Sequence, residues 1–157
     1  MRWMRTFLLL TLTTILLSGC AENESTTPTT NSKLESLAQP TPTCTSQDFQ
    51  GGSRWITGQL EAFKKSEPAE AYSYASEEFR KANSLQDFAA IIVSQYSMLL
   101  DIKEFQILSC EKNGELFTFV LKMVDNQSNS YSMEYLLTFS DKKWGVEGAS
   151  VTLKVSS

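Results

Sequence analysis

The chain has 157 residues, with 14 basic and 18 acidic side chains, a net charge of −4 and no histidine. An acidic balance argues against a nucleic-acid partner, because neutralising phosphates requires a basic face. The lack of histidine removes nucleophilic sites built on a Ser-His or Cys-His pair and most zinc sites. The common glycine-rich phosphate-binding motifs are also missing, so we expect no cofactor and no metal ion.

The first residues have the pattern of a secretory signal peptide. Arg2 and Arg5 precede an apolar run at residues 7–17. This run is too short to cross a bilayer, which takes about 20 apolar residues. Its length and its basic flank are typical of a signal peptide, and we predict one at residues 1–19.

The apolar run ends in Leu17-Ser18-Gly19-Cys20, which resembles the lipobox of bacterial lipoproteins at all four positions. The resemblance implies cleavage between Gly19 and Cys20, a diacylglyceryl group on the Cys20 thiol and, usually, acylation of the new amino terminus. Two or more acyl chains hold a protein stably at a membrane, whereas one chain holds it only marginally. The alternative is an ordinary buried cysteine after an uncleaved segment.

The resemblance also indicates a location. Ala21 follows the predicted lipidated cysteine, in place of the aspartate associated with inner-membrane retention. We therefore expect an exported protein anchored to the periplasmic face of the outer membrane in a diderm organism, or at the cell surface otherwise. Cleavage would leave 12 basic and 18 acidic residues, so attachment would depend on the lipid and not on a basic patch.

Residues 20–47 are predicted to begin with the lipidated cysteine and to continue as a flexible stalk. The segment is rich in Thr, Ser and Pro, most clearly at residues 26–30 and 39–43. Such a composition cannot bury enough apolar surface to offset the entropy of ordering. About 25 residues of coil reach roughly 25–30 Å, which would hold the domain at residues 48–157 away from the membrane.

Two cysteines, Cys44 and Cys110, remain once Cys20 carries lipid. In an oxidising, exported setting we predict a disulfide between them. It would close a loop of about 65 residues and stabilise the fold by about 2–4 kcal/mol. The alternative is two independent buried thiols. A redox site is not expected, because the chain has no C-x-x-C.

The predicted domain begins with helices. Ser53 is expected to cap a helix that starts at Arg54, because apolar residues follow at helical spacing. Pro68 suits the first turn of a second helix, and Ser76 is expected to cap a short one at 77–81. The strongest helix is predicted at 85–98, where Ser84 and Asp87 resemble a capping box and the apolar residues share one face.

Strand periodicity follows in the second half. Strands are predicted at 102–110, 115–124, 131–140 and 144–155, with Asn113-Gly114 as a hairpin turn and Gly148 as a bulge or bend. Helices followed by antiparallel strands predict an α+β domain. Its N-terminal helices would pack on a curved, four-stranded antiparallel sheet.

Several motifs in this domain resemble a bacterial family known as domain-of-unknown-function family 4864, over roughly residues 54–152. They are QLEAF at 59–63, AYSYAS at 71–76, Phe79-Arg80, Phe88, Tyr96 and WGVEG at 144–148. The resemblance implies a cone-shaped, nuclear transport factor 2-like (SnoaL-like) fold, in which a curved sheet wraps a long helix. Glu67 replaces an expected Asp, and Ser97-Met98 replaces an expected proline. The family offers no activity to transfer, and its superfamily includes enzymes, ligand binders and scaffolds.

An enzyme would need an acid or base with a shifted pKa in a pocket. The carboxylate candidates are Asp87, Asp101, Glu104 and Glu134. Capping explains Asp87, and Asp101 and Glu104 are expected at solvated positions. Glu134 alternates with apolar neighbours and is expected to point outward or into a cavity. We assign no catalytic residue and rank catalysis last.

A binding module is the preferred interpretation. Aromatic side chains with polar tips suit a lined cavity or an interface, and the candidate pocket residues are Trp55, Tyr72, Tyr96, Tyr131 and Tyr135. The partner would be a small ligand or an envelope protein, although each aromatic could equally be ordinary core. The alternative function is an assembly accessory that dimerises through the sheet. The sequence does not indicate an oligomeric state.

Overall fold

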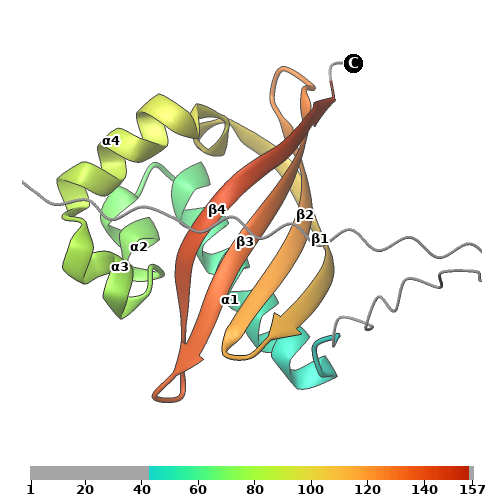
Figure 1. Ribbon diagram of the computed structural model, residues 1–157. Coiled ribbons are helices and arrows are strands. Elements are labelled where there is room, and N and C mark those ends of the chain that lie inside the picture. Colours follow the sequence, from blue (N-terminus) through green and yellow to red (C-terminus); the bar gives the residue numbers. More distant parts are fainter. Residues whose placement is uncertain (1–42, 156–157) are drawn as a thin grey trace, which may run out of the picture. The chain divides into compact units, whose positions relative to one another are not determined.

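The computed structural model describes residues 43–155, so the predicted signal peptide, the lipobox and most of the predicted stalk lie outside the described residues. This part of the chain folds in the following order (Figure 1): α1 (Ser46–Lys64), α2 (Pro68–Ser73), α3 (Glu77–Ala82), α4 (Leu85–Gln95), the short 3-10 helix η1 (Ser97–Leu100), β1 (Ile102–Asn113), β2 (Leu116–Asp125), β3 (Ser130–Ser140) and β4 (Lys143–Val155). Helices precede strands, as the sequence predicts.

The strands form one antiparallel sheet in the order β1-β2-β3-β4. Register shifts mark bulges in β1 and in β4, where Glu147 is the extra residue beside Gly148. Bulges bend a strand and increase its twist. Figure 1 shows the sheet curving across α1, with α2, α3 and α4 beside the β4 edge. The predicted α+β fold, with helices packed on a curved four-stranded sheet, is confirmed.

The start of α1 differs from the prediction. The helix begins at Ser46, and Thr45 and Asp48 form its capping box: the Asp48 amide donates to Thr45 Oγ1 at 3.1 Å. The predicted Ser53 cap is therefore wrong, because Ser53 lies inside the helix. Glycine disfavours a helix interior, so the pair Gly51-Gly52 argues locally against a helix. Here the missing side chains allow the helix to pack closely against the sheet. Cys44 and Thr45 thus belong to the folded part, although the sequence placed them in the stalk.

The two glycines let α1 approach the sheet closely. A Cβ added at Gly52 would lie 2.2 Å from Phe119 Cζ, and one added at Gly51 would lie 2.6 Å from Trp144 Nε1. Both aromatic side chains belong to the concave face of the sheet. Further along the same helix, Ile56 and Leu60 are fully buried in the core. The N-terminal half of α1 is thus in direct contact with the sheet.

The disulfide lies next to this contact. Cys44 and Cys110 are bonded, with their Cα atoms 5.6 Å apart. The Cys44 amide also donates to the Cys110 carbonyl at 3.4 Å. Residues just before α1 are therefore joined to β1 covalently and through the backbone.

Other helix boundaries also have local causes. The capping box of Ser84 and Asp87 starts α4 as predicted, but the helix ends at Gln95 and not at residue 98. Tyr96 leaves helical geometry, with φ −131° and ψ 35°, and η1 follows. Glu67 occupies the N-cap position of α2 without a side-chain cap hydrogen bond. The Asp expected there from the family resemblance is a preferred capping residue.

The turn between β2 and β3 is organised by Asp125, whose buried carboxylate accepts four hydrogen bonds. The donors are the amides of Gln127 (3.0 Å) and Asn129 (2.8 Å), Asn129 Nδ2 (2.9 Å) and the Tyr131 hydroxyl (2.9 Å). Burial alone would raise the pKa of Asp125, but these hydrogen bonds outweigh it and the pKa lies below its usual value.

Gly52→Ala should destabilise the protein. Overpacking a tight core costs about 1–3 kcal/mol, whereas alanine at an open helical position would gain about 1 kcal/mol. Gly148→Ala is the control, because a Cβ there meets nothing within 4 Å. Urea unfolding should show a lower midpoint for Gly52→Ala and little change for Gly148→Ala. A Gly52→Ala protein as stable as the wild type would contradict the close packing of α1.

The Asp125 carboxylate should make stability depend on pH. Its pKa is lowered by folding, so its contribution is present above the unfolded value of about 3.9 and is lost as pH falls below it. Asp125→Asn should reduce stability at pH 7 and flatten the acid dependence in urea titrations between pH 7 and pH 3. Asp141→Asn, in the exposed β3–β4 turn, is the control. Equal acid sensitivity of Asp125→Asn and wild type would refute the assignment.

Candidate ligand-binding cavity

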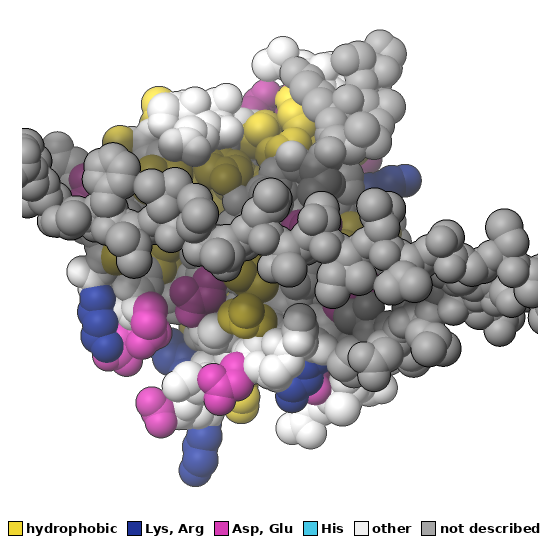
Figure 2. Space-filling model, in the orientation of Figure 1, with side chains coloured by type: hydrophobic (Ala, Val, Ile, Leu, Met, Phe, Trp, Pro, Cys, Tyr) yellow, Lys and Arg dark blue, Asp and Glu magenta, His cyan; other side chains and the backbone are white. Residues whose placement is uncertain are grey.

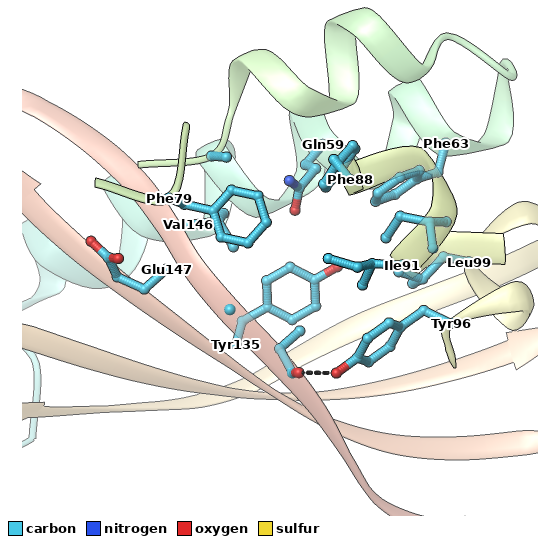
Figure 3. A pocket seen from close by; sticks show the side chains of 14 residues that line it. Gln59, Phe63, Phe79, Phe88, Ile91, Tyr96, Leu99, Tyr135, Val146 and Glu147 are labelled. Atoms are coloured by element: carbon cyan, nitrogen blue, oxygen red, sulfur yellow. Dashed lines mark hydrogen bonds between the residues drawn. The ribbon is translucent and has the colours of Figure 1, made fainter. Parts of the chain in front are cut away.

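A cavity of about 130 Å³ lies between the helices and the concave face of the sheet, with 14 residues around it. Its walls come from α1, α3, α4, η1, β3 and β4, together with Ala75 before α3. Figure 3 shows their side chains converging on one apolar space, with the Tyr135 ring on its sheet side. The cavity adjoins the C-terminal half of α1, away from the Gly51-Gly52 contact.

Tyr135 supplies the polar group of the cavity. The side chain is 1% exposed, and its hydroxyl points into the space (Figure 3). No hydrogen bond to this hydroxyl is found among the described groups. Because Ser53 Oγ is the one side-chain atom among them that is sealed from solvent without a partner, the Tyr135 oxygen is open to the cavity. Burial, and to a smaller extent the charge interaction with Tyr96, raises the pKa of Tyr135 far above its usual value. The hydroxyl therefore stays protonated and can donate or accept a hydrogen bond.

Gln59 provides a second polar atom. This α1 side chain is 3% exposed, and its Nε2 donates to the Ala71 carbonyl at 3.0 Å. That bond fixes the amide orientation, so the carbonyl oxygen is the end left for the cavity. Figure 3 shows this oxygen on the side of the amide that faces Tyr135. An amide oxygen can only accept a hydrogen bond.

Tyr96 closes the cavity but does not offer it a free hydroxyl. Its hydroxyl donates to the Ala149 carbonyl on β4 at 2.6 Å, the dashed line in Figure 3. Ala149 belongs to the edge strand β4, so this bond satisfies an edge carbonyl while it joins the end of α4 to the sheet. The ring of Tyr96 contributes an apolar wall.

The remaining walls are apolar and centred on Phe88. Its ring stacks on Phe63 with centroids 5.9 Å apart and also contacts the rings of Phe79 (6.0 Å) and Tyr72 (5.5 Å). The single charged lining residue is Glu147, which accepts a hydrogen bond from Thr138 Oγ1 at 2.9 Å and points away from Tyr135 in Figure 3. No lysine or arginine lines the cavity, so an anionic ligand would lack a counter-charge.

The structure separates the five aromatic candidates. Tyr96 and Tyr135 line the cavity, whereas the others have hydrogen bonds elsewhere. Trp55 donates to the Tyr74 carbonyl at 2.8 Å, Tyr72 donates to the Asn83 carbonyl at 2.6 Å, and Tyr131 donates to Asp125. Gln59 was missed as a site residue, although it is the first residue of the QLEAF motif at 59–63, because that motif indicates the family and not a position in a cavity.

The four carboxylate candidates lie outside this cavity. Asp87 accepts from Ser84 in the capping box, and these hydrogen bonds lower its pKa. Asp101 accepts from Asn126 Nδ2 at 2.7 Å, and Glu104 and Glu134 are exposed on their strands. Within residues 43–155, His, Cys, Asp and Glu form no group of three that could hold a metal ion. None of the helices described is long and apolar enough to cross a membrane.

Similar solved structures share this architecture at low sequence identity. A nuclear transport factor 2-like protein of unknown function from Shewanella baltica OS155 has a TM-score of 0.54 and 13% identity, covering 73% of this chain and 99% of its own. A cystatin-like domain of unknown function from Nostoc punctiforme PCC 73102 has a TM-score of 0.52 and 15% identity, with 72% and 81% covered. These likenesses concern the fold alone. No protein of curated function matches the sequence.

The family comparison agrees with the resemblance in the motifs. The model of the family described as domain of unknown function DUF4864 matches residues 45–156, which include every helix and strand that the structure describes. The expected family and the nuclear transport factor 2-like fold are both confirmed. This chain belongs to the DUF4864 family.

Proposed function

We propose that this protein is an exported, lipid-anchored binding module whose cavity takes a small, uncharged and mainly apolar ligand. The observation that carries the proposal is the Tyr135 hydroxyl: the residue is 1% exposed, no protein hydrogen bond to its hydroxyl is found among the described residues, and the oxygen is open to an apolar space. A ligand that replaces water at this hydroxyl would keep a hydrogen bond while burying its own apolar surface.

The size of the cavity sets the size of the group that fits. An apolar cavity of about 150 Å³ accommodates benzene, so the 130 Å³ observed here suits roughly five or six non-hydrogen atoms. Tyr135 and Gln59 could hold a water molecule in the empty protein. A ligand hydroxyl can reproduce the hydrogen bonds of such a water while its carbon chain contacts the phenylalanine walls.

Binding is preferred over catalysis because of where the carboxylates lie. The four acidic candidates named from the sequence are outside the cavity, and Glu147 is held by Thr138. A general base has to be within hydrogen-bond reach of the proton that it removes. The sheet-mediated dimer stays a prediction. The outward face of the sheet mixes charged Lys122 and Glu134 with apolar residues, so it does not by itself favour a dimer.

The anchor in this proposal is Cys20, which would become the first residue of the mature chain after cleavage between Gly19 and Cys20. The coil between Cys20 and Cys44 would allow a reach of roughly 25–30 Å. The disulfide supports an oxidising compartment. The domain would then sample ligands close to the outer membrane of a diderm organism, or close to the cell surface otherwise.

Tyr135→Phe should reduce a preference for hydroxylated ligands. We expect the mature chain, residues 20–157 expressed without its signal peptide, to bind 1-pentanol more tightly than its isostere 1-chloropentane. One hydrogen bond contributes about 0.5–1.5 kcal/mol, so the preference should be roughly threefold to tenfold. In Tyr135→Phe this preference should shrink, because only the Gln59 oxygen can then pair with the alcohol, as measured by amide chemical shifts.

Tyr74→Phe is the matched control, because Tyr74 lies outside the cavity. It should keep the alcohol preference of the wild type. The proposal fails if neither compound shifts the cavity residues, or if Tyr135→Phe retains the full preference.

Cys20→Ala should abolish lipid attachment. Labelled fatty acid should be incorporated into the wild-type protein in cells and not into Cys20→Ala, which should accumulate as the uncleaved precursor. Cys110→Ala is the control, because it removes a cysteine from the domain but leaves the lipobox intact. Fatty-acid labelling of Cys20→Ala would overturn the anchor assignment.

A further inference from the structure

A second apolar depression lies directly behind one wall of the Tyr135 cavity. Its volume is about 290 Å³, and it shares Phe63, Phe88 and Ile92 with the cavity. We call it the outer groove. Its other apolar residues include Val93 at the end of α4 and Leu100 in η1. The shared side chains therefore form a partition between the cavity that holds the Tyr135 hydroxyl and a larger apolar groove.

The outer groove exposes apolar side chains to solvent. Val93 is 64% exposed and Leu100 is 46% exposed. Figure 2 shows hydrophobic side chains mainly in the upper half of the visible face and most of its charged side chains in the lower half. The single charged residue lining the groove is Glu67, and no lysine or arginine lines it. Its lining thus favours the same chemistry as the inner cavity, namely an uncharged hydrocarbon.

The two partition residues differ in how firmly they are held. Phe88 contacts three aromatic rings, those of Phe63, Tyr72 and Phe79. Ile92 has no ring to stack and lies one turn later on the same helix. A rotamer change of an aliphatic side chain on the helix face disturbs less packing than a rotation of the locked ring. The partition therefore has the fewest ring contacts at Ile92.

We propose that the cavity and the outer groove form one site for a neutral, single-chain amphiphile, with its polar end at Tyr135 and its chain passing Ile92 into the groove. This inference rests on the proposed function. Gln59 offers only an acceptor, while the Tyr135 hydroxyl donates or accepts. A ligand hydroxyl or primary amide can form hydrogen bonds with both groups. A carboxylate cannot donate a hydrogen bond to the Gln59 oxygen, and no lysine or arginine among the lining residues would balance its charge.

The volumes give the chain length. Taking benzene in about 150 Å³ as the scale, the cavity and groove together hold roughly 16 or 17 non-hydrogen atoms. A saturated alcohol of about 12–16 carbons would fill both. One of five carbons would fill only the inner cavity.

The test is a series of linear alcohols from 1-pentanol to 1-tetradecanol, titrated into the mature chain and followed by amide chemical shifts. Affinity should rise by up to about fourfold per added methylene, and the Val93 and Leu100 amides should shift only for alcohols longer than about six carbons. Val93→Asp should remove the gain from the longer chains and leave 1-pentanol unaffected. Leu108→Asp, an exposed change on β1 outside both spaces, is the control and should alter neither.

The outcomes separate this inference from the proposed function. If 1-pentanol binds at Tyr135 but affinity is flat with chain length and insensitive to Val93→Asp, the shared site is overturned and the single cavity stands. If 1-pentanol does not bind, both fail. If dodecanoate binds as tightly as 1-dodecanol, the assignment of a neutral head group is overturned. A length-dependent gain that Val93→Asp abolishes supports the proposal.

Discussion

The close approach of α1 to the sheet is the constraint on which the rest of the fold depends. Gly51 and Gly52 bring the helix backbone against Trp144 and Phe119 at distances that a Cβ would prevent. The disulfide to β1 joins the chain just before the helix to the sheet. The tightly packed half of α1 thereby fixes the other half, where Gln59 and Phe63 border the cavity. The space near Tyr135 is bounded mainly by helices and strands, with Ala75 and Tyr96 the lining residues from connections between them.

The sequence predicts the four strands and the start of α4 because these elements have regular local residue patterns. Alternating residues locate all four strands, and the Ser84–Asp87 box locates the start of α4. The start of α1 is missed because Gly51-Gly52 interrupts the local helical pattern. The two glycines allow a tertiary contact with the sheet, which the local pattern does not reveal. The pocket residues are separable only in three dimensions: Tyr131 and Tyr135 lie on the same face of β3, but Asp125 binds the first hydroxyl and leaves the second free. Gln59 belongs to the QLEAF motif, but its place in the cavity cannot be predicted from the sequence. That place depends on the Ala71 carbonyl accepting from the amide nitrogen, which leaves the amide oxygen for the cavity.

Membership of the DUF4864 family fixes the architecture and leaves the task open, since one fold supports many functions. What distinguishes this chain is local chemistry: an apolar space, two inward polar atoms and no basic residue in its lining. In the proposed function, these features would select ligands by neutrality and by a hydroxyl-like group. An anchor at Cys20 would add proximity to a membrane, where amphiphiles of that kind concentrate. The proposed anchor and cavity are thus compatible with one role, although each is tested separately.

The most direct measurement is the ¹³Cζ chemical shift of labelled tyrosine rings while 1-pentanol is added to the mature chain. The Tyr135 resonance should move and saturate, because its hydroxyl gains a partner. The Tyr131 resonance should stay in place, because its hydroxyl is bonded to Asp125. An unchanged Tyr135 resonance, or equal shifts of both rings, would contradict a ligand site at Tyr135.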